Sequence, residues 1–221
     1  MKKLIIYLSF CISIVLLSAT ICISQPDTSK VKNDKTLNAA QVKSKVDSFL
    51  SAKSDNGVKK LSKTLQTKGF KAESGYFGNT STLEKDGKTI TNSVYLQDYK
   101  KAGKNGALGV ITVSDGTNQD SYMFSLESES GNYNDVTEHY VNEKQEIVKS
   151  NSWNSCLYKS ILANCGTTTG LKMWNYCMSF FSSWTLFVNC IKQAWCSIKA
   201  FACCSCDCSW WCKYAAGCCD R

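Results

Sequence analysis

The cysteines of this chain are distributed so unevenly that they divide it into regions of different character. Of fourteen cysteines, Cys11 and Cys22 lie close to the N-terminus, none falls between Ile23 and Ser155, and twelve lie in residues 156–221. All six tryptophans also lie beyond residue 150. A chain of 221 residues usually forms one or two domains. The break in composition near residue 150 therefore predicts two small parts, which follow an N-terminal segment.

The N-terminal segment has the pattern of an export signal. Lys2 and Lys3 precede an uncharged apolar run from Leu4 to Ile23, and Pro26 follows shortly after it. We therefore expect residues 1–24 to be a signal peptide and the mature chain to be secreted. The run is also long enough for an uncleaved membrane anchor, and lipoprotein processing before Cys22 is a third alternative.

The twelve C-terminal cysteines are expected to form disulfide bonds. Disulfides persist outside the cell, and an even number of cysteines in a short secreted segment is typical of a crosslinked framework. Thiol-rich metal binding is the alternative, but this segment has no histidine and no second clean CxxC pair. We expect no metal and no other cofactor, and the sequence selects no pairing. The disulfide candidates are Cys156, Cys165, Cys177, Cys190, Cys196, Cys203, Cys204, Cys206, Cys208, Cys212, Cys218 and Cys219.

Between residues 25 and 150 the sequence predicts a flexible leader and an α+β domain. Residues 25–36 are mostly polar and lack apolar periodicity, which is typical of an exposed leader. Residues 37–53 and 58–65 carry apolar side chains at helical spacing, which predicts two short helices. Beyond Gly69 the apolar residues alternate, in runs separated by turn signals such as Asp115-Gly116. For residues 37–150 we predict an antiparallel meander of about four strands with both helices against one face.

The middle part contains no arrangement that is typical of an active site. His139 is the only histidine, and no positioned nucleophile accompanies it, so we interpret it as a surface histidine on a strand. Glu127, Glu129, Asp135 and Glu138 lie in or beside a polar turn without calcium-loop spacing, and we interpret them as solvated. We expect no catalytic residue and no enzymatic activity.

Residues 151–221 are predicted to form a small, mainly helical, disulfide-rich domain. A short helix is expected over residues 154–164, ended by Gly166, and residues 167–170 are expected to form a loop. Residues 173–191 then carry no charge, and this length approaches that of a membrane span. The same stretch fits the buried helix of a small domain equally well. A peptide that hides such a helix in water can expose it at a bilayer.

The charge of the chain indicates an anionic partner. The formal net charge is +8, and the C-terminal part carries more lysine and arginine than aspartate. After export, the nearest large anion is a bacterial membrane or cell envelope rather than nucleic acid. The candidates for membrane contact combine lysines with aromatic side chains, which favour the bilayer interface. They are Trp174, Phe180, Phe181, Trp184, Phe187, Trp195, Lys172 and Lys192.

The segment from Cys212 to Gly217, with the sequence CKYAAG, resembles a segment of the bacteriocins named after halocin C-eight. Members of that family are exported precursors with a small, cysteine-rich, hydrophobic peptide at the C-terminal end. The resemblance implies that residues 25–150 act as an immunity partner, which sequesters the peptide after a single cut. This chain departs from the prototype because it lacks a twin-arginine signal, has denser cysteines at its end and is richer in tryptophan.

Two hypotheses of function follow from these observations. In the first, the chain is a secreted bacteriocin precursor, and the freed tail acts on the membrane or envelope of competing bacteria. A processing protease would cut in the region of Lys149, Ser150, Asn151 and Ser152. In the second, the chain stays uncut and is a secreted binding or adhesion module with a disulfide-rich tail. A product that begins near Asn151 supports the first hypothesis, and an intact mature chain supports the second.

Overall fold

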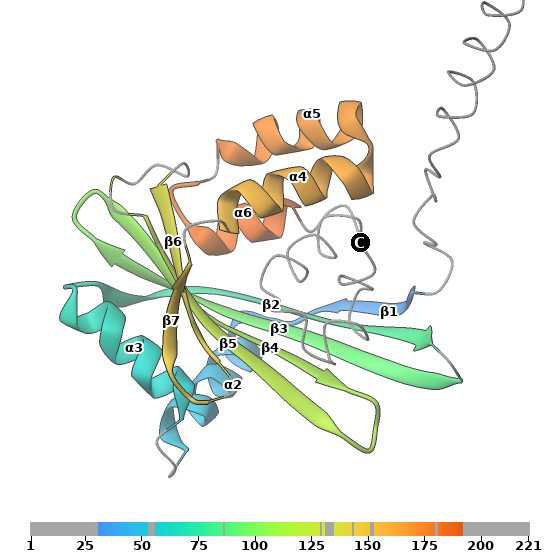
Figure 1. The fold of residues 1–221 in the computed structure, drawn as a ribbon, viewed down its shortest axis with the longest axis horizontal. Coiled ribbons are helices and arrows are strands. Elements are labelled where there is room, and N and C mark those ends of the chain that lie inside the picture. The colour runs from blue at the N-terminus through green and yellow to red at the C-terminus, as the bar shows by residue number, and fades with distance from the viewer. Residues whose placement is uncertain are drawn as a thin grey trace, which may run out of the picture.

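In the computed structural model of the chain, helices cover both faces of an antiparallel sheet (Figure 1). The structure describes residues 31–52, 56–85, 87–128, 130, 135–142, 144–150, 153–179 and 181–191. The expected signal peptide therefore lies outside the described residues, and so does the chain from Lys192 onward.

The sheet has seven strands, which follow one another in chain order. They are β1 (Val31–Thr36), β2 (Lys71–Lys85), β3 (Lys88–Lys101), β4 (Lys104–Ser114), β5 (Gln119–Ser128), β6 (Val136–Val141) and β7 (Ile147–Ser150). Each strand pairs antiparallel with its neighbour in sequence, so β1 and β7 form the two edges. Gly87 and Gly103 have positive φ values, which glycine adopts without strain, and they allow the tight β2–β3 and β3–β4 connections.

Helices α2 (Ala39–Ser51) and α3 (Gly57–Thr67) pack on one face of the sheet. A capping box begins α2, because the Asn38 side chain accepts from Gln41 N–H at 2.9 Å and the Gln41 side chain accepts from Asn38 N–H at 3.0 Å. These findings confirm the two helices predicted from the apolar spacing. The core on this face consists of Val42, Val46, Val58, Leu61, Leu65, Phe70, Tyr95, Tyr99, Leu108 and Val110.

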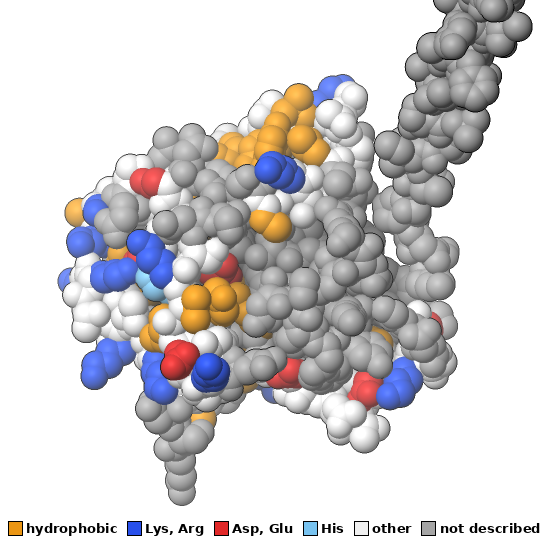
Figure 2. Space-filling model, viewed as in Figure 1, with side chains coloured by type: hydrophobic (Ala, Val, Ile, Leu, Met, Phe, Trp, Pro, Cys, Tyr) orange, Lys and Arg blue, Asp and Glu red, His pale blue; other side chains and the backbone are white. Residues whose placement is uncertain are grey.

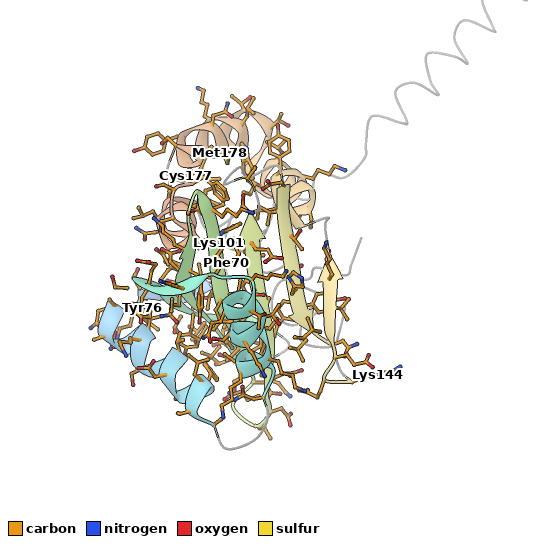
Figure 3. The ribbon with its side chains drawn as sticks, turned by 90° about the vertical axis from the view of Figure 1, so that its left-hand side faces the viewer. Phe70, Tyr76, Lys101, Lys144, Cys177 and Met178 are labelled. Atoms are coloured by element: carbon orange, nitrogen blue, oxygen red, sulfur yellow. A yellow bond between two sulfur atoms is a disulfide. The ribbon has the colours of Figure 1, made fainter. Side chains whose placement is uncertain are left out.

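Helices α4 (Trp153–Cys165), α5 (Thr167–Met178) and α6 (Trp184–Ile191), which we call the tail helices, cover the opposite face. Helices α4 and α6 contact the strands, and α5 packs on α4 and α6 (Figure 1). Successive side chains of a strand point to opposite faces. Val94 and Leu96 accordingly meet the tail helices, whereas Tyr95 between them meets α2 and α3. Figure 3 shows the labelled Cys177 and Met178 on the tail helices, away from α2 and α3. The tail helices therefore share one hydrophobic core with the sheet, which differs from the separate C-terminal domain that we expected.

The sheet is larger than the predicted meander of about four strands. Residues 31–36, which were expected to belong to a flexible leader, form strand β1 because their backbone pairs with that of β2. Strand β2 is mostly polar and β7 is only four residues long, so neither carries the apolar alternation that marks a strand in sequence. Pairing with their neighbours, rather than local pattern, defines these strands.

The uncharged stretch of residues 173–191 is not a single helix, and this corrects the prediction from its length. Helix α5 already begins at Thr167, where we expected a loop, and it ends at Met178. Helix α6 begins at Trp184, and the Ser183 hydroxyl caps it by accepting from Leu186 N–H at 3.2 Å. A serine in this position favours a helix start over helix continuation. Within the described ranges, no helix has the length and apolar character needed to cross a bilayer.

Candidate functional site

The sheet face under the tail helices is the candidate functional site, and we call it the tail-binding face. Apolar strand residues such as Leu96, Ile111 and Phe124 form its floor. The rings of the tail helices that cover it meet edge to face, with 4.9 Å between the centroids of Phe181 and Trp184. The face therefore holds the most aromatic part of the described tail away from water.

One charged side chain, Asp98 of β3, interrupts this apolar surface and holds the start of α6. Its Oδ2 accepts hydrogen bonds from the hydroxyl groups of Ser183 at 2.5 Å and Thr185 at 2.6 Å. Its Oδ1 accepts from the backbone N–H of Thr185 at 3.0 Å. A carboxylate in this position satisfies free donors of the first helical turn and complements the helix dipole. Asp98 is buried, so these donors replace the water that its charge would otherwise require.

Gly75 of β2 leaves the space that the Asp98 carboxylate occupies. A Cβ atom added at Gly75 would lie 2.2 Å from Oδ2 and 3.0 Å from Cγ of Asp98. The pairing of β2 with β3 shifts its register between Ala72 and Tyr76, so the glycine lies in an irregular part of the strand. We call Gly75, Asp98, Ser183 and Thr185 together the α6 clasp.

A second polar contact holds the turn between α5 and α6. The side-chain Nδ2 of Asn105, at the start of β4, donates to the backbone carbonyl of Phe181 at 2.8 Å. Asn105 lies across from Lys100 in the β3–β4 pair, close to Asp98. Both polar anchors therefore come from one end of the β3–β4 hairpin, and they fix the position of the α5–α6 turn.

A disulfide between Cys177 of α5 and Cys190 of α6 crosslinks two of the tail helices. Both cysteines are buried in the core that the tail helices share with the sheet. Cys156 of α4 also forms a disulfide. The prediction that the tail carries disulfide bonds is confirmed at Cys177 and Cys190. The candidates from Cys196 to Cys219 lie outside the described residues.

Glu138 of β6 places a buried carboxyl group on the tail-binding face. Within the described chain it accepts one hydrogen bond, from the Tyr122 hydroxyl at 3.1 Å. Burial raises the pKa of Glu138 to about 8, and the hydrogen bond from Tyr122 acts in the opposite direction. The prediction that Glu138 and Glu127 are solvated is wrong, because both lie on strands and are buried. Asp135 is half-buried beside its turn, and Glu129 lies outside the described residues.

His139 lies on strand β6 as expected, but it is buried under α3 instead of lying on the surface. Its Nδ1 is 3.6 Å from Oε1 of Glu127, its Nε2 is 3.4 Å from Nζ of Lys68, and Lys68 forms an ion pair with Glu127. Burial, and then the charge of Lys68, lowers the pKa of His139, while Glu127 raises it. Alternation along β6 explains the burial, since Glu138 and His139 point to opposite faces of a sheet covered on both sides.

The residues predicted to contact a membrane divide into a buried group and an exposed one. Trp174, Phe181, Trp184 and Phe187 are buried in the core that the tail helices share with the sheet, whereas Lys172 is exposed. The remaining candidates, Phe180, Trp195 and Lys192, lie outside the described residues. The buried aromatic side chains can reach a membrane only after the tail helices leave the sheet.

The predicted processing region connects the edge of the sheet to the first tail helix. Lys149 and Ser150 lie in β7, the edge strand that pairs with β6. Helix α4 begins at Trp153, and Asn151 and Ser152 between these elements lie outside the described residues. A cut in this connection would separate the tail helices from the sheet without interrupting a helix.

The α6 clasp and Asn105 were not predicted from the sequence. A signal was available for Asp98, because it continues the alternation of Val94 and Leu96 and so places a charge on an apolar face. Its partner Ser183 lies 85 residues further along the chain. No local pattern connects positions so far apart.

Comparison of the chain with protein-family models, with curated proteins and with solved structures finds no match. The resemblance to the halocin C-eight bacteriocins therefore stays a prediction. It is based on Cys212 to Gly217, which lie outside the described residues.

Proposed function

We propose that the chain is the exported precursor of a bacteriocin. In this proposal, residues 151–221 form a disulfide-crosslinked antimicrobial tail, and residues 25–150 hold the tail until a protease cuts the connection between them. The freed tail then acts on the anionic membrane or envelope of competing bacteria. No catalytic step by the chain itself is required.

The burial of the aromatic side of the tail helices against the sheet of the same chain carries this proposal. Trp174, Phe181, Trp184 and Phe187 are all buried in the core that the tail helices share with the sheet. Each such side chain gains roughly 2–3 kcal/mol from leaving water, so a tail that carries four of them needs a covering surface or a lipid phase. The sheet supplies that surface before release, and a bilayer supplies the alternative after it.

The α6 clasp supports a holding role for residues 25–150 because it is specific in position. Apolar contact alone tolerates many arrangements of two surfaces. A buried carboxylate with three donors requires one arrangement, in which Ser183 and Thr185 meet Asp98. This geometry is what an immunity partner of the tail would need in order to recognise it after cleavage.

Mass analysis of the secreted protein tests the precursor. We expect a product that begins between residues 149 and 153, and a mass that increases on reduction as its disulfides open. The oxidised product should release dye from vesicles of phosphatidylglycerol and inhibit a related strain. An oxidised tail that does neither would contradict the proposal.

The tail-binding face suggests a matched test of masking. The uncut chain should release little dye, because its aromatic residues lie on the sheet. The uncut Asp98→Ala variant should release more, and the uncut Asp47→Ala variant, which changes an exposed residue of α2, should behave like the unmodified chain. Equal release by the two variants would contradict masking by the tail-binding face.

A second candidate function, an uncut secreted binding or adhesion module, is favoured by the shared core of sheet and tail helices. A module of this kind would use the assembled chain and would never free its tail. An intact mature chain as the only secreted product would support this function in place of the first.

A further inference from the structure

The tail helices keep apolar side chains on their outer surface, although the sheet covers their inner surface. Across the described residues, the large hydrophobic side chains that remain exposed are Tyr176 at 63%, Leu186 at 52%, Leu171 at 40% and Ile147 at 37%. All except Ile147 belong to α5 and α6. Figure 2 shows hydrophobic side chains gathered over the helices α4 and α5, with basic side chains beside them. The tail therefore offers a second apolar surface, distinct from the one on the sheet.

The exposed residues of α5 follow from helical geometry. Side chains four residues apart lie one above the other on a helix. Lys172 and Tyr176 form one exposed row, and Leu171 and the exposed Asn175 form the row beside it. Trp174, on the other side of the helix, is buried, and its ring meets those of Tyr158 of α4 and Phe187 of α6. We call the surface of Leu171, Lys172, Asn175 and Tyr176 the outer face of α5.

Every charged side chain within the described tail helices is basic. The sequence from Trp153 to Ile191 contains no aspartate or glutamate. Lys172 lies on the face itself, and Lys159 is exposed on α4, which packs against α5. Tyrosine favours the headgroup level of a bilayer, and lysine near it attracts anionic lipid. Apolar side chains with lysines and without carboxylates are thus complementary to an anionic lipid surface.

We propose that the outer face of α5 docks the intact, uncut chain on an anionic bilayer. Leu171 and Tyr176 enter the headgroup region, while Lys172 and Lys159 contact lipid phosphates. Binding is shallow, because Trp184 and the other buried aromatic residues stay on the sheet. Docking therefore brings the chain to the bilayer without permeabilising it. The inference deepens the proposed function, on which it rests for the membrane context, and it places the precursor at the surface where the tail acts.

Flotation of the intact secreted chain with vesicles tests the docking. We expect the chain to float with vesicles that contain phosphatidylglycerol, to stay behind with vesicles of pure phosphatidylcholine, and to dissociate at high salt. Dye trapped in the vesicles should stay inside. Absence of binding to phosphatidylglycerol vesicles, or equal binding to vesicles with and without phosphatidylglycerol, would overturn the proposal.

Variants locate the docking surface. The double variant Leu171→Ser/Tyr176→Ser should bind about tenfold more weakly, because both apolar contacts are removed, and Lys172→Glu should weaken binding by a similar factor at low salt. The matched controls are Ile147→Ser, a hydrophobic residue on β7 that is about as exposed as Leu171, and Lys144→Glu, in the turn that Figure 3 shows far from Cys177. Both controls should bind like the unmodified chain. Equal weakening by the controls would overturn the proposal.

Two further measurements separate the possible failures. Sedimentation shows whether the double variant changes self-association instead of vesicle binding. A change in self-association alone would assign the outer face of α5 to a second copy of the chain and overturn the docking. The freed oxidised tail is assayed in parallel for dye release. If the freed tail permeabilises vesicles but the intact chain does not bind them, the docking proposal is overturned and the proposed function is not. An intact chain that docks while the freed tail is inactive supports the docking and contradicts the proposed function.

Discussion

The two faces of the sheet are covered by helices in two different ways. The buried residues that α2 and α3 contribute to their core are aliphatic, with Leu61 and Leu65 fully buried. The tail contributes aromatic side chains such as Trp184 and Phe187 to the opposite core, and the buried carboxylate of Asp98 lies on that face. The sequence position of the helices differs as well, because α2 and α3 lie between β1 and β2, whereas the tail helices follow β7.

This difference indicates which of the two helical layers can separate from the sheet. Helices α2 and α3 are anchored by paired strands at both ends, so their departure would take β1 from the sheet edge with them. Among the described residues, the tail helices follow β7 in the chain, and side-chain packing, the α6 clasp and Asn105 hold them on the sheet. We expect the tail helices to open as a unit of lower local stability, while α2, α3 and the sheet stay folded.

Substitutions that create a cavity in one core or the other give the largest expected effects and test whether the two faces of the sheet unfold separately. Phe187→Ala and Leu61→Ala each remove a fully buried side chain and should cost roughly 3–5 kcal/mol of stability. Hydrogen exchange should then differ in location: Phe187→Ala accelerates exchange in α4, α5 and α6, whereas Leu61→Ala accelerates it throughout the sheet. Equal acceleration of α3 in both variants would mean that the two faces unfold together.

Loss of the clasp should open the tail side alone. Asp98→Ala leaves the hydroxyls of Ser183 and Thr185 and one backbone N–H without their acceptor, at a cost of about 2–3 kcal/mol. Tryptophan fluorescence and exchange of α6 report the opening, and Asp98→Asn should restore part of the stability because its carbonyl still accepts. An Asp98→Ala protein with unchanged exchange in α6 would show that packing alone holds the tail.

The two faces should respond to pH in opposite directions. The pKa of Glu138 is raised from 4.5 to about 8, so its contribution is fully present below about pH 4.5 and is lost as the pH rises through about 8. The tail side should therefore lose on the order of 2 kcal/mol towards alkaline pH, as measured by denaturant unfolding. Glu138→Gln should flatten this dependence, and Glu146→Gln, in the exposed turn before β7, should leave it unchanged.

The α3 side gives the contrasting part of this prediction. The folded pKa of His139 is lowered below 6.5, so its contribution is present above that pH and is lost as the pH falls through the lowered value. The protection of the α3 amides, measured relative to their intrinsic exchange rate at each pH, should therefore fall at acidic pH, and His139→Gln should remove the effect. The same pH response on both faces would contradict the assignment of Glu138 and His139 to separate cores.

The smallest expected effect concerns the space beside the clasp. Gly75→Ala places a methyl group 2.2 Å from Oδ2 of Asp98 and should cost about 1–2 kcal/mol. In the Asp98→Ala background the same substitution should cost much less, because the clashing carboxylate is absent. A double-mutant cycle of chemical unfolding measures this coupling. Additive effects of the two substitutions would mean that Gly75 acts through the backbone of β2 instead.

Local patterns in the sequence predicted the elements that have strong local signals. Helices α2 and α3 follow from apolar spacing. Helix α4 also was predicted, and it ends at Cys165, directly before the predicted stop at Gly166. Strands β1 and β2 were missed, because their polar residues form strands only through pairing with neighbours.

The candidate site depended on contacts that a local pattern does not encode. The uncharged run from 173 to 191 suggested one helix, but α5 ends at Met178 and Ser183 caps the start of α6. Burial of Glu138 and His139 also depends on both faces of the sheet being covered, and the cover of the second face comes from the tail. An isolated charge on an apolar strand face, such as Asp98, is the sequence signal that would have indicated a distant partner.

The strand order of the sheet also determines the order of events as the chain is made. Every strand pairs with the strand that directly precedes or follows it, so no pairing waits for residues beyond Ser150. Domains generally fold from the N-terminal side during synthesis. The sheet with α2 and α3 can thus be folded before the tail helices are synthesised. The nascent tail then meets a folded surface, which acts as an intramolecular chaperone for its apolar, cysteine-rich segment.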